Sequence, residues 1–131
     1  MTVIFCVDER GGLLFNNRRQ SMDSLLRERV LKIIGDEKLS CDEYTAKQFE
    51  DKSKLNIVTD ENFSDCEFVF AEKQNPTLLL EKADKIYLYN WNRKYPFDKS
   101  LGELPKEFKL ISSEDFVGSS HEKITEEIYS K

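Results

Sequence analysis

The chain has 131 residues, of which 39% are hydrophobic and 34% are charged, and its formal net charge is −5. This length suits one domain over residues 1–131, and the apolar runs are too short for a transmembrane helix. The negative charge argues against nonspecific binding to nucleic acid, and no segment resembles a signal peptide. We therefore expect a cytoplasmic protein that binds neither nucleic acid nor membrane. Three cysteines without CxxC spacing predict neither a disulfide framework nor a metal site.

The N-terminal third combines apolar runs with one amphipathic segment. Residues 2–7 are apolar throughout, which predicts a strand buried on both faces, and residues 13–15 are a second short apolar run. Between residues 22 and 34, apolar side chains recur at helical spacing opposite charged ones. We expect a helix there, with Ser21 as its N-cap and Gly35 just beyond its end.

The middle of the chain begins with a polar, acidic stretch. Within residues 36–54 we expect only a short helix over about 45–50, anchored by Phe49. Residues 55–58 and 67–71 predict strands. Only eight residues separate these two strands, which is short for a parallel crossover. They are therefore antiparallel partners or are not neighbours in the sheet.

The next segment has the pattern of a strand–helix–strand unit. Asn75 and Pro76 predict the start of a helix that continues to about residue 82. Residues 85–90 predict the following strand, which makes 68–90 a βαβ unit. Together with the first strand, these elements predict a single-domain, three-layer α/β sandwich with a mostly parallel or mixed central sheet.

The C-terminal part allows two interpretations. Residues 92–106 predict a loop, and residues 108–112 predict a last strand. In the tail 118–131, Ser119 and Glu122 resemble a capping box, which favours a final helix with His121 in its first turn. The same residues would also form an edge strand. Of these two structures, we expect the helix.

Three polar clusters follow predicted strands, where α/β sheets bind their ligands, and the third of them comprises residues 112–115 and 118–121. The first contains Asn16, Asn17, Arg18 and Arg19 and leads into the long helix. A helix N-terminus with two arginines favours a phosphate or a carboxylate. The competing interpretation is that both arginines pair with acidic residues of the segment 36–72 and that the asparagines form a turn.

The second cluster contains Trp91, Arg93 and Tyr95. Its rings and cations suit a nucleotide, a pterin-like ring or an acidic peptide. Alternatively, the rings pack against the domain and the cations extend into solvent. His121 is the single histidine and a weak candidate for acid–base catalysis. No G-x-S-x-G motif accompanies the serines near it, so we expect His121 to be structural.

Two stretches resemble dihydrofolate reductases. Residues 7–18 are similar to the opening of that family, in which a first strand ends in a glycine-bearing loop before the substrate helix. Residues 86–89, 95–98 and 108–112 are similar to its closing third. The resemblance implies a dihydrofolate-reductase-like or Rossmann-like scaffold, with Asp23 as the nearest counterpart of the substrate-binding acid. The Leu-Pro-Trp before the substrate helix and the Gly-Gly before the cofactor helix are absent.

The sequence also resembles a group of short bacterial proteins without an established activity. Some of them carry a ribonuclease Z label, but the His/Asp metal-binding motif which that activity requires is absent here.

Three functional hypotheses follow. The first is binding of an anionic small molecule or an acidic protein segment without catalysis, which needs no cofactor. The second is an NADPH-dependent reductase related to dihydrofolate reductase, in which Asp23 orients the substrate. The third is a protein–protein interaction module with Trp91, Tyr95 and Phe97 as an aromatic anchor. The sequence leaves the oligomeric state open.

Overall fold

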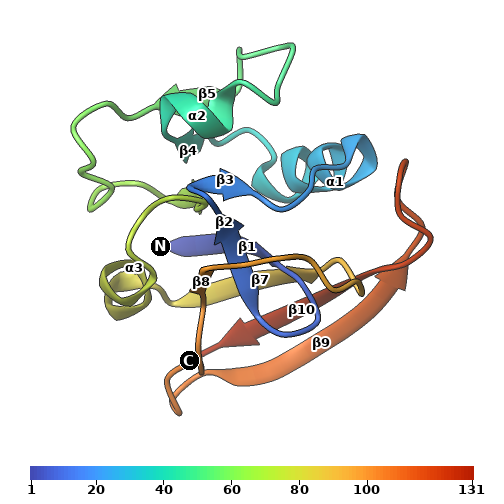
Figure 1. Cartoon of the computed structure of the whole chain (residues 1–131). Helices are drawn as coiled ribbons and strands as arrows, with labels where there is room; N and C mark the ends of the chain where they lie inside the picture. The colour runs from blue at the N-terminus through green and yellow to red at the C-terminus, as the bar shows by residue number, and fades with distance from the viewer.

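A seven-stranded sheet forms the centre of the protein in the computed structural model, which describes residues 1–131 (Figure 1). Its strand order is β5-β4-β6-β1-β7-β10-β9. In that order, the strands span Leu55–Ile57, Leu39–Cys41, Phe68–Phe70, Thr2–Val7, Lys85–Asn90, Ile124–Ser130 and Lys109–Phe116. The strands from β5 to β7 are parallel, whereas β10 is antiparallel to both of its neighbours. The expected α/β fold with a mostly parallel, mixed sheet is confirmed.

The long helix α1 spans Ser24–Ile34 and begins later than the sequence predicted. Its N-cap is Asp23 and not Ser21, because the Asp23 carboxylate accepts hydrogen bonds from the N–H groups of the first turn. The helix ends at Gly35, whose φ of 58° is easily adopted by glycine, as expected.

The second helix, α2, spans Glu43–Ala46 and is shorter and earlier than the helix expected over 45–50. Asp42 caps it by accepting a hydrogen bond from the Thr45 N–H at 2.8 Å. Strand β4 immediately precedes it and was not predicted, because its central Ser40 interrupts the apolar pattern. Since β4 lies between β5 and β6, those two strands are not neighbours, which confirms one of the two alternatives.

The third helix, α3, spans Pro76–Lys82 with Asn75 as its N-cap, as predicted. It joins β6 to β7, and β1 lies between these two strands, parallel to both. None of the three helices has the length and apolar composition needed to cross a membrane.

A small second sheet lies over one end of the large one (Figure 1). It contains β3 (Arg18–Arg19), β2 (Gly12–Phe15) and β8 (Lys99–Ser100), in that order. Strands β2 and β3 form a hairpin whose two turn residues, Asn16 and Asn17, have φ angles of 52° and 59°. Asparagine tolerates this left-handed region, and such turns match the twist of a hairpin.

The expected C-terminal helix is wrong, because residues 124–130 form the strand β10. Ile124 and Ile128 fit a helical spacing of four, but they also lie on one face of a strand together with Glu126. Glu126 is buried on this face and pairs with Arg29 of α1 at 2.9 Å. An isolated sequence does not show this distant partner, which makes an acid acceptable on the inner face of the strand.

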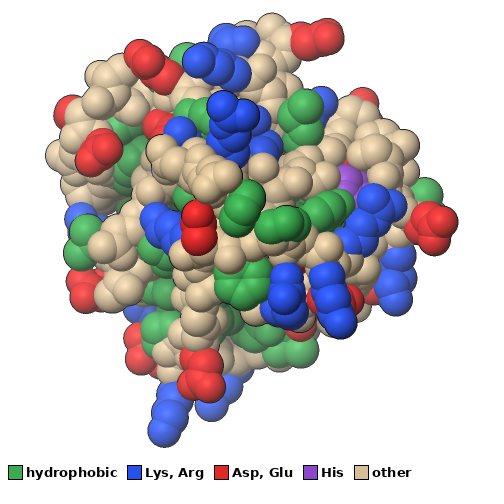
Figure 2. Space-filling model, in the orientation of Figure 1, with side chains coloured by type: hydrophobic (Ala, Val, Ile, Leu, Met, Phe, Trp, Pro, Cys, Tyr) green, Lys and Arg blue, Asp and Glu red, His purple; other side chains and the backbone are tan.

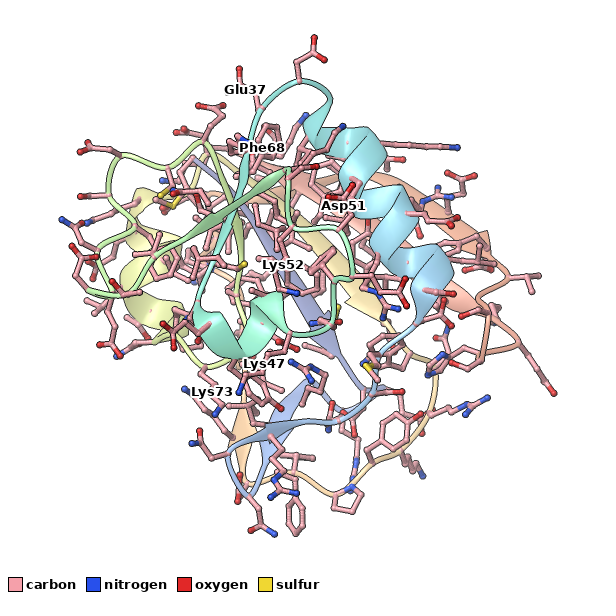
Figure 3. The ribbon with its side chains drawn as sticks, turned by 90° about the horizontal axis from the view of Figure 1, so that it is seen from above. Glu37, Lys47, Asp51, Lys52, Phe68 and Lys73 are labelled. Carbon is pink, nitrogen blue, oxygen red and sulfur yellow. The ribbon has the colours of Figure 1, made fainter.

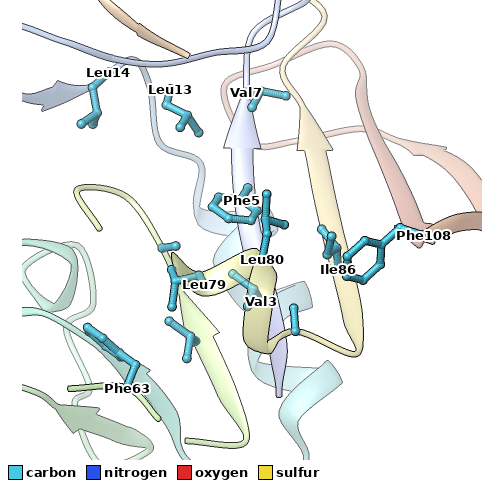
Figure 4. Packing of buried hydrophobic residues seen from close by; sticks show 13 residues of the cluster. Val3, Phe5, Val7, Leu13, Leu14, Phe63, Leu79, Leu80, Ile86 and Phe108 are labelled. Carbon is cyan, nitrogen blue, oxygen red and sulfur yellow. The ribbon is translucent and has the colours of Figure 1, made fainter. Parts of the chain in front are cut away.

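Side chains from both faces of the sheet form the core. Val3 and Phe5 of β1 belong to one cluster, with Leu79 of α3 (Figure 4). Ile4 belongs to a second cluster, with Val30 of α1. Strand β1 is therefore buried on both faces, as its apolar sequence predicted, and helices α1 and α3 form separate layers on opposite faces.

Candidate functional site

A cavity of about 540 Å³ opens beside the β2–β3 hairpin, and we call it the hairpin cavity. It is lined by Phe15, Asn16, Arg18, Arg19, Gln20, Tyr95 and Pro96. The Gln20 side chain donates to the Pro96 carbonyl at 3.4 Å, and Arg10 donates to the Tyr95 carbonyl at 2.7 Å. The structure thus brings Asn16, Arg18 and Arg19 together with Tyr95, although they are distant in sequence.

The two neighbouring arginines of β3 have different environments. Arg18 is exposed and makes no ion pair. Arg19 donates from Nε and Nη2 to both carboxylate oxygens of Glu72, at 2.9 and 3.0 Å. Its burial works against the charged form, but the pairing with Glu72 outweighs this and raises the pKa of Arg19. Arg19 therefore has an internal acidic partner, and Arg18 is the cation that faces the cavity unpaired.

Glu72 was not singled out in the sequence, yet it connects three elements. It directly follows β6 and Ala71, and it is 9% exposed. Besides Arg19, it accepts hydrogen bonds from Thr45 Oγ1 at 2.8 Å and Gln48 Nε2 at 3.2 Å. We call these four side chains the Glu72 cluster. The feature of the sequence that could have identified Glu72 is an acidic residue just after a buried strand.

The ring of Tyr44 contacts two cations at the edge of this cluster. The Arg19 guanidinium is 4.1 Å from the ring centroid, and the Lys73 ammonium is 3.9 Å from it. Lys73 extends beside α2 (Figure 3). On the face seen in Figure 2, Lys and Arg side chains gather near the hairpin, and acidic side chains lie mainly towards the rim. The two charged residues that line the hairpin cavity, Arg18 and Arg19, are both basic.

Trp91 and Arg93 do not line the hairpin cavity. Trp91 is only 2% exposed and stacks on the ring of His121, with centroids 4.5 Å apart. Arg93 is exposed and lines a separate depression, whose other lining residues are Glu9, Trp91, Asn92, Glu122 and Lys123. Trp91 therefore packs against the domain, which was the alternative interpretation of the second cluster. It is not available as a surface anchor for a protein partner.

The second polar centre surrounds Asp23, and we call it the Asp23 network. Both oxygens of the Asp23 carboxylate accept several hydrogen bonds from the protein. The donors are the N–H groups of Leu25, Leu26, Ser119 and Ser120, the Ser120 hydroxyl and Nδ1 of His121. Burial acts to raise the pKa of Asp23, but these donors outweigh it and hold the pKa well below its usual value.

His121 lies inside the Asp23 network and is 4% exposed. Its Nδ1 is 2.9 Å from Asp23 Oδ2, and its Nε2 is 2.9 Å from the Ser21 hydroxyl. Tyr95 approaches the same Nε2 with its hydroxyl at 3.4 Å. The structure therefore unites the two weak catalytic candidates, Asp23 and His121, with a serine that the sequence had assigned to a helix cap.

The turn of residues 118–121 holds His121 against α1. The Gly118 N–H donates to the His121 carbonyl at 2.9 Å, which closes the turn. A Cβ atom at Gly118 would overlap Oδ2 of Asp23 and the side chain of Ile124. Only glycine permits this close approach of the turn to the carboxylate.

A narrow recess lies at the carboxyl ends of β1, β6 and β7. It is lined by Cys6, Leu13, Arg19, Gln20, Ser21, Ala71, Glu72 and Trp91. Its volume of about 10 Å³ accommodates about one water molecule. Burial first, and then the charge of Glu72, raises the pKa of the Cys6 thiol well above its usual value. We call this space the strand-end recess, and it adjoins the hairpin cavity through Arg19 and Gln20.

Comparisons with known proteins define the fold of the chain. No protein-family model matches it, and no curated protein is similar to it in sequence. Among solved structures, it is similar to dihydrofolate reductase from Enterococcus faecalis complexed with NADP(H) and RAB-propyl. The two share 11% sequence identity, the match covers 98% of this chain and 94% of that chain, and the TM-score is 0.68. The chain thus has a dihydrofolate-reductase-like fold.

Proposed function

We propose that the protein binds a small anionic molecule, a carboxylate or a phosphate, in the hairpin cavity without using a nicotinamide cofactor. The unpaired guanidinium of Arg18 supports this proposal most directly. Arg19, the other cation of β3, is neutralised by Glu72, so its charge is balanced inside the protein. Arg18 has no such partner, and a guanidinium binds carboxylates and phosphates with two parallel hydrogen bonds.

The remaining cavity walls suit a small ligand. Asn16 adds an amide group, and Tyr95 adds an aromatic edge. A volume of about 540 Å³ is in the usual range for a small-molecule site. The Gln20–Pro96 and Arg10–Tyr95 hydrogen bonds hold the two walls together before a ligand arrives, which limits the entropy cost of binding.

Titration with inorganic phosphate and with citrate, followed by amide chemical shifts, tests this proposal. We expect shifts at residues 15–20 and 95–96, and we expect Arg18→Ala to weaken binding about tenfold, or ~1.4 kcal/mol. Arg93→Ala is the matched control, because it removes the same charge from an exposed arginine outside the cavity. Absence of shifts in the native protein, or equal weakening in both variants, would overturn the proposal.

The similarity of fold to a reductase favours a second candidate, an NADPH-dependent reductase, but the residues here do not fit the cofactor. Open α/β sheets bind ligands beyond the carboxyl ends of their strands, where this chain has the strand-end recess and a cavity of about 300 Å³ whose lining includes the acidic Asp42 and Glu61. Glu72 and Lys73 follow β6 where the reductase family has Gly-Gly, and Asp23 is saturated with internal hydrogen bonds. We expect millimolar NADPH to leave the melting temperature unchanged, whereas a rise of several degrees would favour the reductase.

A further inference from the structure

We propose that Ser21, His121 and Asp23 form a catalytic triad that makes Ser21 a nucleophile towards carboxylic esters. This inference goes beyond the proposed anion binding and does not depend on it. It rests on a continuous chain of contacts: Ser21 Oγ lies 2.9 Å from Nε2 of His121, and Nδ1 of the same ring lies 2.9 Å from Asp23 Oδ2. Such triads are recognised by the geometry and roles of their members and occur on unrelated folds.

The surroundings of Asp23 fix the proton positions in this triad. Four backbone N–H groups and the Ser120 hydroxyl donate to the carboxylate, so it is an acceptor only. Nδ1 of His121 must therefore carry the proton that lies towards Asp23, and Nε2 presents a lone pair. This is the tautomer in which Nε2 accepts the proton of Ser21. Asp23 is thus a positioning residue, and Ser21 and His121 are the catalytic ones.

Packing holds the imidazole in this orientation. Trp91 stacks on one face of the ring with an interplanar angle of 25°. The side chain of His121 is 1% exposed, so water does not compete for its nitrogens. Tyr95 Oη is 3.4 Å from Nε2, farther than Ser21, and offers that nitrogen a second polar neighbour. The base is therefore preorganised, as general-base catalysis requires.

Ser21 is the accessible member of the triad. It is half-buried and lines the strand-end recess, which shares Arg19 and Gln20 with the hairpin cavity. The N–H of Met22 makes no hydrogen bond within the protein. In acyl-transfer enzymes, the N–H group after the nucleophile is a common donor to the oxyanion.

The proposed reaction is the hydrolysis of an ester and involves no change of oxidation state. Ser21 Oγ bonds to the carbonyl carbon while its proton moves to Nε2 of His121, and the carbonyl electron pair moves onto its oxygen. The bond between carbon and the leaving oxygen then breaks, and the leaving alkoxide takes the proton from Nε2. Water next attacks the acyl-serine and gives a proton to Nε2. The Ser21 Oγ–acyl bond breaks, and Ser21 regains that proton.

Covalent labelling of the full-length chain with a fluorophosphonate, located by peptide mass spectrometry, tests the triad. We expect the label on Ser21, loss of labelling in Ser21→Ala and a reduction of at least about 100-fold in His121→Gln. Ser113→Ala is the matched control, because Ser113 is an exposed serine of β9 outside the Asp23 network. Its labelling should stay within about threefold of the native protein, since it leaves the Ser21–Nε2 contact intact.

Hydrolysis of p-nitrophenyl acetate provides the second measurement. We expect an initial burst of one equivalent of p-nitrophenol per chain, which Ser21→Ala removes without lowering the melting temperature by more than a few degrees. Labelling that is no faster in the native protein than in the urea-unfolded chain, or that persists in Ser21→Ala, would overturn the proposal. Phosphate binding at the hairpin cavity is measured separately, so either proposal can fail alone.

Discussion

Asp23 and Glu72 are both buried carboxylates near the carboxyl ends of the central strands, but their charges are balanced in different ways. Asp23 accepts four hydrogen bonds from backbone N–H groups, and these fix the turn 118–121 to the start of α1. Glu72 accepts only from side chains, and its main partner is the cation of Arg19. The Asp23 network therefore depends on the path of the backbone, whereas the Glu72 cluster depends on which side chains are present.

The largest effect should follow from Asp23→Ala. This change removes a helix cap, worth about 1 kcal/mol, and the hydrogen bonds of the Ser119 and Ser120 N–H groups, worth about 0.5–1.5 kcal/mol each. It also leaves Nδ1 of the buried His121 without its acceptor, at about 1–3 kcal/mol. We expect a loss of about 4 kcal/mol in the free energy of unfolding, measured by urea denaturation. Asn75→Ala, which removes a cap without a buried network, is the control and should cost about 1 kcal/mol. Similar losses in both variants would mean that Asp23 is only a cap.

Glu72→Ala should have the next largest effect, because it leaves the Arg19 charge largely buried and unpaired. The side chain of Arg19 is 19% exposed, and we expect a loss of about 3 kcal/mol. The double variant Arg19→Ala with Glu72→Ala should cost clearly less than the sum of the two single changes, because neither charge then remains without its partner. Additive losses in the thermodynamic cycle would show that the two side chains contribute independently.

Lowering the pH should further distinguish the Asp23 network from the Glu72 cluster. The pKa of Asp23 is lower in the folded protein than in the unfolded chain. Its contribution to stability is therefore complete above the unfolded pKa and is lost as the pH falls through the folded one. Between about pH 5 and pH 2, we expect Asp23 to account for a loss of about 2 kcal/mol. The measurement compares the free energy of unfolding of the native protein with that of Asp23→Asn at each pH. If the two curves of free energy against pH run parallel, the loss of stability in acid does not come from Asp23.

The sequence predicted the parallel strands β1, β6 and β7, because they are continuous or alternating apolar runs, but not the parallel strand β4, whose apolar pattern Ser40 interrupts. It did not predict β3 and β8, which are two residues long, or the strand character of β10. The site residues divide in the same way, into those that the local sequence identified and those that depend on distant contacts. Arg18 and Tyr95 were identified from local composition, but the pairing of Arg19 with Glu72 joins residues 53 positions apart. Ser21 was assigned to the helix start because its contact with His121, 100 positions away, leaves no local pattern.

The smallest effect should come from Arg18→Ala. Arg18 is exposed and unpaired, so its removal should change the free energy of unfolding by less than about 0.5 kcal/mol. Arg19→Ala, one residue further along the same strand, should cost about 3 kcal/mol, because Glu72 then remains buried without its cation. Urea denaturation of the two single variants measures this contrast directly. A loss above about 1 kcal/mol in Arg18→Ala would place Arg18 in the stabilising network of β3, and it would no longer be free to bind an anion in the hairpin cavity.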